Sequence, residues 1–99
     1  EHVIADLFAL LARQGAVIER LTSDSRRAAP TAAFFAWPGA TADGRRHIAQ
    51  AIELGCAAVV WESADFAWND AWRAPNAGVK DLKAQAGFIA HAYASQQRP

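Results

Sequence analysis

The stretch IAQAIELGCAAVVW, residues 48–61, decides the fold class of this chain. Ile48, Ala51 and Ile52 recur at the spacing of one apolar face of a short helix. Gly55 follows as the glycine that commonly ends a helix, and residues 57–61 form an apolar run of the length of a buried strand. A helix, a glycine and an apolar strand in this order are the pattern of an α/β unit.

The segments on either side of this stretch predict further elements. Apolar residues line one face of a helix over residues 3–13, and the aromatic run at 34–37 predicts a buried strand that stops at Pro38-Gly39. The other predicted elements are a strand over 17–23, a short edge strand over 76–79 and a helix over 81–94. Together they predict an α/β fold, with a small mixed sheet of about four to five strands packed with about three helices.

Composition fits one globular domain and excludes several functions. The 99 residues are the length of a single domain, 1–99, and ten basic and ten acidic side chains give no net charge. A nucleic-acid-binding protein is usually basic, and no apolar run reaches the roughly 18 residues of a membrane span. We therefore expect no nucleic-acid partner, no membrane partner and a cytoplasmic location.

The cysteine and histidine residues do not have the spacing of a metal site. Cys56 is the single cysteine, which excludes an internal disulfide and a cysteine-rich metal site. His2, His47 and His91 lack metal-ligand spacing. We interpret Cys56 as a small buried residue and expect no metal in this chain.

The chain contains no methionine, and it stops at Arg98-Pro99 directly after a helical pattern. Proline is common just after a helix, so these residues are typical of the start of a linker. We interpret the chain as part of a longer protein.

Two segments are candidates for ligand binding. Thr22-Ser23-Asp24-Ser25-Arg26 follows a predicted strand, and ligands of α/β sheets tend to bind beyond the carboxyl ends of strands. Residues 39–44 form a loop of small side chains whose backbone groups a flat ligand could reach, and Asp43 is a plausible N-cap for the helix that follows. The alternatives are a turn tied together by Asp24 and Arg26, and a loop with no ligand.

Motifs for catalysis and cofactor binding are missing from the sequence. No G-x-G-x-x-G follows a strand, and Arg45-Arg46 occupies the place of the Lys-Ser/Thr pair of a phosphate-binding loop. No G-x-S-x-G surrounds a serine, and nothing indicates that Ser25, Asp24 and His47 converge into a triad. We predict no catalytic residue and no ATP site in these residues.

The four tryptophans divide into two pairs. Trp37 and Trp61 lie in apolar strands and are predicted to belong to the core. Trp68 and Trp72 lie four residues apart and could mark a face that packs on a partner domain. This face supports a rival hypothesis, a non-enzymatic α/β interaction module.

A series of motifs follows one another along the chain: Leu21 to Arg26, Pro30, Phe34 to Gly39, Ala42 to Arg45, and Ile48 to Gly55. In this order they resemble the first domain of MurE ligases, members of the Mur ligase family that add the third amino acid to UDP-N-acetylmuramoyl-L-alanyl-D-glutamate. The resemblance extends from about residue 21 to about residue 62, with the spacing of the family. MurF ligases have a similar first domain and are the alternative, although Ser25 and the Ala-Asp-Gly-Arg loop favour MurE.

The resemblance implies a three-domain ligase of which this chain is the amino-terminal, UDP-binding domain. ATP and Mg²⁺ would act in the full-length enzyme and not in this fragment, which would be inactive alone. The implied partners are the UDP-N-acetylmuramoyl-dipeptide substrate and the central ATP-binding domain of the same chain, in a monomer. The resemblance favours meso-diaminopimelate as the added amino acid, with lysine as the alternative. The substrate-binding residues carried over by position are Ser23, Ser25, Ala40, Thr41 and Ala42.

The chain departs from the family pattern at one turn. Pro30-Thr31-Ala32-Ala33 stands where the family usually has Pro-Gly-Asp-Leu. The carried-over contacts lie on either side of this turn, so we expect the binding site to be retained.

Overall fold

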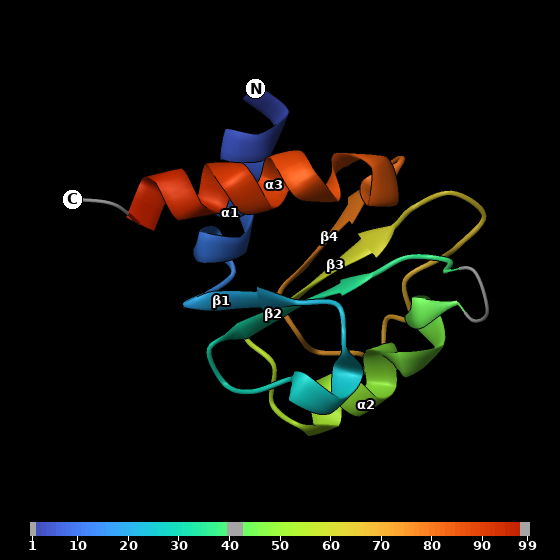
Figure 1. Cartoon of the computed structure of the whole chain (residues 1–99). Coiled ribbons are helices and arrows are strands. Elements are labelled where there is room, and N and C mark those ends of the chain that lie inside the picture. The colour runs from blue at the N-terminus through green and yellow to red at the C-terminus, as the bar shows by residue number, and fades with distance from the viewer. Residues whose placement is uncertain (1, 40–42, 98–99) are drawn as a thin grey trace.

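The computed structural model describes residues 2–39 and 43–97, with side chains over 7–39 and 43–93. Within these residues the chain forms three α-helices, four strands and two short 3₁₀ turns (Figure 1). In chain order these are α1 (His2–Arg13), β1 (Arg20–Thr22), η1 (Ser25–Arg27), β2 (Ala32–Ala36), η2 (Gly44–His47), α2 (Ile48–Glu53), β3 (Ala58–Glu62), β4 (Asn76–Val79) and α3 (Leu82–Gln97). The predicted α/β class is confirmed.

The four strands form one sheet in the order β1-β2-β3-β4, with β4 at the edge as predicted. All three pairings are parallel, so the prediction of a mixed sheet is wrong. Neighbouring strands are joined by crossover segments and not by hairpins, and a crossover returns the chain in the same direction. The crossover from β2 to β3 contains η2 and α2, and the one from β1 to β2 contains η1.

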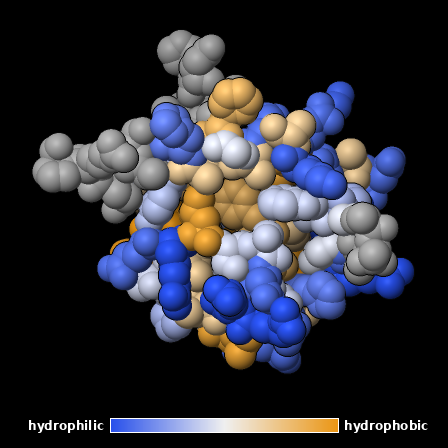
Figure 2. Space-filling model, in the orientation of Figure 1, coloured by the Kyte–Doolittle hydropathy of each residue, from blue (hydrophilic) through white to orange (hydrophobic). Residues whose placement is uncertain are grey.

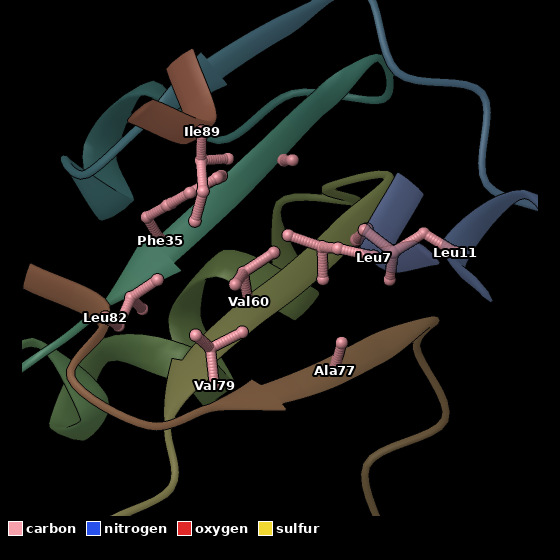
Figure 3. Close-up of a cluster of buried hydrophobic side chains, with 10 residues drawn as sticks. Leu7, Leu11, Phe35, Val60, Ala77, Val79, Leu82 and Ile89 are labelled. Carbon is pink, nitrogen blue, oxygen red and sulfur yellow. The ribbon is translucent and has the colours of Figure 1, made fainter. Parts of the chain in front are cut away.

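The sheet is the middle of three layers. Helices α1 and α3 cover one face, and α2 with the two 3₁₀ turns covers the other (Figure 1). β2 is buried along its whole length, and its side chains alternate between the two faces. Phe35 lies beside Ile89 in the cluster on the α1–α3 face, which also contains Leu7 and Leu11 (Figure 3), whereas Phe34 belongs with Ile48 to the cluster on the α2 face.

Aromatic side chains extend the core on the α2 face. Trp61 of β3 stacks on Trp68 with ring centroids 5.7 Å apart, and Trp68 meets Trp72 edge to face at 5.0 Å. Phe66 stacks against Trp72 at 6.5 Å. The rings of Trp68 and Trp72 are therefore partly buried against this domain's own core, and a face that packs on a partner domain stays a prediction.

Two glycines and one aspartate lie at the ends of helical elements. Gly15 and Gly55 have φ values of 96° and 83°, in the left-handed region that glycine adopts without strain, two residues after the last residues of α1 and α2, as predicted for Gly55. Asp43 is an N-cap, but it caps η2, and α2 begins four residues later than a direct cap would place it. The predicted strand over 17–23 is reduced to three residues.

Candidate functional site

Three neighbouring hollows lie along the carboxyl ends of β1 and β2, and Ser23 lines all of them. Their volumes are about 140, 220 and 420 Å³. We call this surface the trough. Figure 2 shows the surface on the side from which Figure 1 is drawn, with apolar side chains near its centre and polar ones around them. From α3 to α2 the trough is lined by Ala86, Ala90, Leu21, Thr22, Ser23, Phe35, Trp37, Gly39, Gly44, His47, Asp24, Ser25, Arg26 and Gln50.

The segment after β1 is held by a compact set of local hydrogen bonds. The Thr22 hydroxyl accepts the backbone N–H of Asp24 at 3.1 Å. The Asp24 carboxylate accepts the backbone N–H of Arg26 at 2.9 Å and two guanidinium N–H groups at 3.0 Å. These bonds from Arg26 hold the pKa of Asp24 below its ordinary value. The turn tied by Asp24 and Arg26, predicted as an alternative to a ligand site, is therefore present.

The two serines of this segment differ in exposure. Ser23 is exposed at the junction of the hollows, whereas Ser25 is only 7% exposed. The Ser25 hydroxyl donates to Oε1 of Gln50 at 3.0 Å, a bond that joins η1 to α2. Gln50 was not predicted as a site residue, because its partner lies 25 positions earlier in the chain.

The second predicted segment lies on the same side of the molecule as the first. Gly39 and Gly44, which flank Ala40, Thr41 and Ala42, line one hollow together with Ser23. The backbone N–H of Gly44 donates to the carbonyl of Trp37 at 2.9 Å, so the chain returns to the end of β2. Ala40, Thr41 and Ala42 themselves lie outside the described residues.

The residues Asp43-Gly44-Arg45 repeat the local geometry of Asp24-Ser25-Arg26. In both, the aspartate Oδ1 accepts the backbone N–H of the arginine at 2.9 Å and its Nε–H at 3.0 Å. The shared Asp-x-Arg spacing is the sequence signal for this arrangement, which sequence reasoning did not use for the second segment. As for Asp24, bonding to the arginine lowers the pKa of Asp43.

Burial distinguishes the two arginines. The side chain of Arg26 is 82% exposed and that of Arg45 is 9% exposed. Arg45 donates to the backbone carbonyls of Glu62 and Ala64 at 3.0 and 2.7 Å and lies 4.8 Å from the centre of the Phe66 ring. Arg45 therefore attaches the far end of the 39–44 loop to the end of β3.

Glu62 continues this connection to α3. Its buried carboxylate accepts the backbone N–H groups of Ala64, Asp81 and Leu82 at 3.2, 3.1 and 2.9 Å. Burial is the largest influence and raises the pKa of Glu62, but the three donors together with Arg45 lower it more, and the net pKa lies below its ordinary value. This role of Glu62 could not be predicted from the sequence, because the donors lie across a loop and on the next element.

The geometry supports binding and not nucleophilic catalysis. The Ser25 hydroxyl donates to Gln50, and the Asp24 carboxylate is paired with Arg26, so Ser25, Asp24 and His47 do not form a catalytic triad.

Over the described ranges, no group of three or more His, Cys, Asp or Glu side chains could hold a metal ion. Over the same ranges, the helices are too short or too polar to cross a membrane.

Comparison with known proteins gives the family. The family described as "Mur ligase family, catalytic domain" matches residues 17–94. The chain belongs to the Mur ligase family. This membership confirms the resemblance found in the motifs around the two Asp-x-Arg segments.

Three similar proteins carry the name UDP-N-acetylmuramoyl-L-alanyl-D-glutamate–2,6-diaminopimelate ligase. The Chromobacterium violaceum protein is 48% identical over 83 residues, which cover 83% of this chain and 17% of that protein. The Janthinobacterium sp. (strain Marseille) protein is 49% identical over 73 residues, which cover 74% of this chain and 14% of that protein. A Neisseria meningitidis serogroup A protein is 48% identical over 71 residues, 71% of this chain and 14% of its own length. This Mur ligase chain thus spans less than a fifth of the length of these relatives.

Proposed function

We propose that this chain is the amino-terminal domain of a MurE-type ligase and binds the uridine diphosphate part of UDP-N-acetylmuramoyl-L-alanyl-D-glutamate. The observation that carries the proposal is the position of Ser23, which lines one hollow with both flanks of the 40–42 loop and another with Ser25. The names of the relatives supply the substrate. They also favour MurE over the MurF alternative.

The trough has the chemistry that a pyrimidine nucleoside needs. Phe35 and Trp37 provide apolar surface in two of the three hollows, and a flat base packs well on such surface. Ser23 and Ser25 supply polar groups beside it, and the backbone of Ala40, Thr41 and Ala42 is the proposed third contact. Volumes of about 220 and 420 Å³ in adjoining hollows fit a nucleoside with its phosphates outside.

The remaining steps belong to other parts of the parent ligase in this proposal. ATP and Mg²⁺ do not fit the residues present, because the sequence lacks a phosphate-binding loop and the described residues lack a cluster of metal ligands. The central domain of the same chain would hold both and activate the substrate carboxylate for attack by meso-diaminopimelate, in a monomeric cytoplasmic enzyme. This domain contributes by holding the nucleotide, and remote binding of this kind positions the reacting group.

Titration of UDP into the 99-residue chain, followed by ¹H–¹⁵N NMR, tests the proposal. We expect shifts at Ser23, Ser25 and residues 40–42, with a dissociation constant above about 10 µM because further substrate contacts come from the next domain. ADP is the matched control, since it carries the same phosphates on a purine. Shifts that are absent, or equal with ADP, would contradict uridine binding and favour an interaction module.

Removal of the Ser25 hydroxyl tests the same site in the full-length ligase. We expect Ser25→Ala to raise the KM for the nucleotide substrate more than it lowers kcat, because the lost contact is remote from the reacting carboxylate. Steady-state kinetics measure both constants. A large loss of kcat at unchanged KM would place Ser25 in a different role.

A further inference from the structure

We propose that Gln50 fixes the direction of the Ser25 hydroxyl and thereby makes the trough select a base whose ring N3 carries a proton. This inference rests on the proposed function, in which the trough holds a pyrimidine nucleotide. The base it favours is an imide such as uracil, and the base it disfavours is cytosine. Gln50 is a positioning residue in this account, because it acts through Ser25.

The hydrogen bond between the two side chains assigns the hydroxyl proton. The Ser25 Oγ lies 3.0 Å from Oε1 of Gln50, and a carbonyl oxygen can only accept. A serine hydroxyl has one proton, so a hydroxyl that donates to Gln50 has only lone pairs left for a ligand. Both residues line the same hollow of about 420 Å³, which places this acceptor at the binding surface.

The surrounding contacts hold the backbone on both sides of this bond, and the Gln50 side chain itself is exposed. Ser25 is 7% exposed, and its carbonyl accepts the backbone N–H of Ala28 at 3.2 Å, which holds η1 closed. Gln50 lies on α2 between the fully buried Ile48 and Ala51, so the helix cannot turn to move it. The neighbouring Asp24 carboxylate is occupied by Arg26 and does not compete for the serine proton.

In this proposal the base presents N3, and not position 4, to Ser25 Oγ. Uracil carries a proton on N3 and would donate to Ser25 Oγ, whereas N3 of cytosine is an acceptor. Two acceptors facing each other at the nearly buried Ser25 hydroxyl make no hydrogen bond, which disfavours cytosine. We expect UDP to bind at least about tenfold more tightly than CDP to the 99-residue chain.

Three substitutions of Gln50 separate the proton direction from simple packing. Gln50→Met keeps the length of the side chain but removes the acceptor, so the hydroxyl can turn and the UDP-to-CDP ratio is expected to fall to within about twofold. Gln50→Glu retains an acceptor and is expected to restore the ratio even if both nucleotides bind more weakly. Gln50→Lys supplies a donor, turns the serine proton towards the ligand and is expected to favour CDP. Glu53→Gln, an exposed change on the same helix, is the matched control and should leave the ratio unchanged.

The measurement is a pair of NMR titrations, with UDP and with CDP, for the 99-residue chain and each variant. The spectrum without ligand shows whether each variant is folded, and Gln50→Lys and Gln50→Glu test the inference if Gln50→Met is not. A ratio that is unchanged in Gln50→Met and Gln50→Lys, while UDP still shifts Ser23 and Ser25, overturns this inference alone. If UDP shifts neither serine in the unsubstituted chain, the proposed function fails and this inference fails with it.

Discussion

Replacement of Arg45 by methionine should destabilise the domain strongly, because its buried guanidinium joins three segments. The substitution removes the bonds to Asp43, to the carbonyl of Glu62 at 3.0 Å and to the carbonyl of Ala64 at 2.7 Å. Hydrogen bonds to a charged group contribute about 1.5–3 kcal/mol each. The Asp43 side chain is 33% exposed and can regain water, which reduces the loss. We expect the free energy of unfolding to fall by about 3 kcal/mol.

Urea and thermal denaturation, followed by circular dichroism, measure this loss. For a domain of this size each kcal/mol corresponds to about 4–8 °C in Tm, so the expected decrease is about 12–24 °C. Arg46→Met is the matched control, because Arg46 is the exposed neighbour on the same 3₁₀ turn and should change stability by less than about 0.5 kcal/mol. The reasoning is refuted if the two variants lose the same stability.

Three further predictions concern two glycines, Glu62 and Cys56. Gly78→Ala places a Cβ 2.9 Å from two ring atoms of Trp61 and should cost about 1–2 kcal/mol in urea unfolding, whereas Gly87→Ala, with open space around it, should gain about 0.5–1 kcal/mol. The pKa of Glu62 in the folded protein lies below its ordinary value of 4.5. The ionised carboxylate therefore stabilises the fold above pH 4.5, and this stabilisation is lost as the pH falls through the folded-state pKa. Glu62→Gln should make the free energy of unfolding depend less steeply on pH at the acid end of a stability-versus-pH curve. Burial raises the pKa of Cys56 to about 11, so Ellman's reagent at about pH 8 should react at least about a hundredfold more slowly than with glutathione, and an equal rate would contradict this.

Elements with a clear apolar period were predictable from the sequence, and their exact ends were not. Leu7 and Leu11 lie buried on the predicted face of α1, and the predicted strand after Gly55 is β3. β2 begins two residues before the aromatic run, because Ala32 and Ala33 pair with β1 and Ala33 also pairs with β3. The end of a strand is set by its partner strands, which local composition does not contain.

The sheet direction and the tryptophan contacts were harder to predict for the same reason. A hairpin and a crossover differ in where the connecting segment packs, and residues 65–75 have no clear periodicity in the sequence. In the structure this segment carries Phe66, Trp68 and Trp72 onto the α2 face. An aromatic pair four residues apart indicated a packed surface correctly, but it could not indicate which surface it packs on.

The two Asp-x-Arg segments show how much of the candidate site follows from local sequence. Each aspartate caps a 3₁₀ turn through the arginine two positions later, with the same two distances, so this geometry is a property of the tripeptide and its spacing. The use of each arginine depends on position in the fold. Arg26 follows an edge strand and stays in solvent, whereas Arg45 follows a central strand and reaches the end of β3. The turn at Asp24 therefore presents its polar groups to the trough, and the turn at Asp43 anchors the 39–44 loop. The local sequence was enough to select these two segments as candidates, but the roles of Gln50, Arg45 and Glu62 depend on contacts with distant parts of the chain.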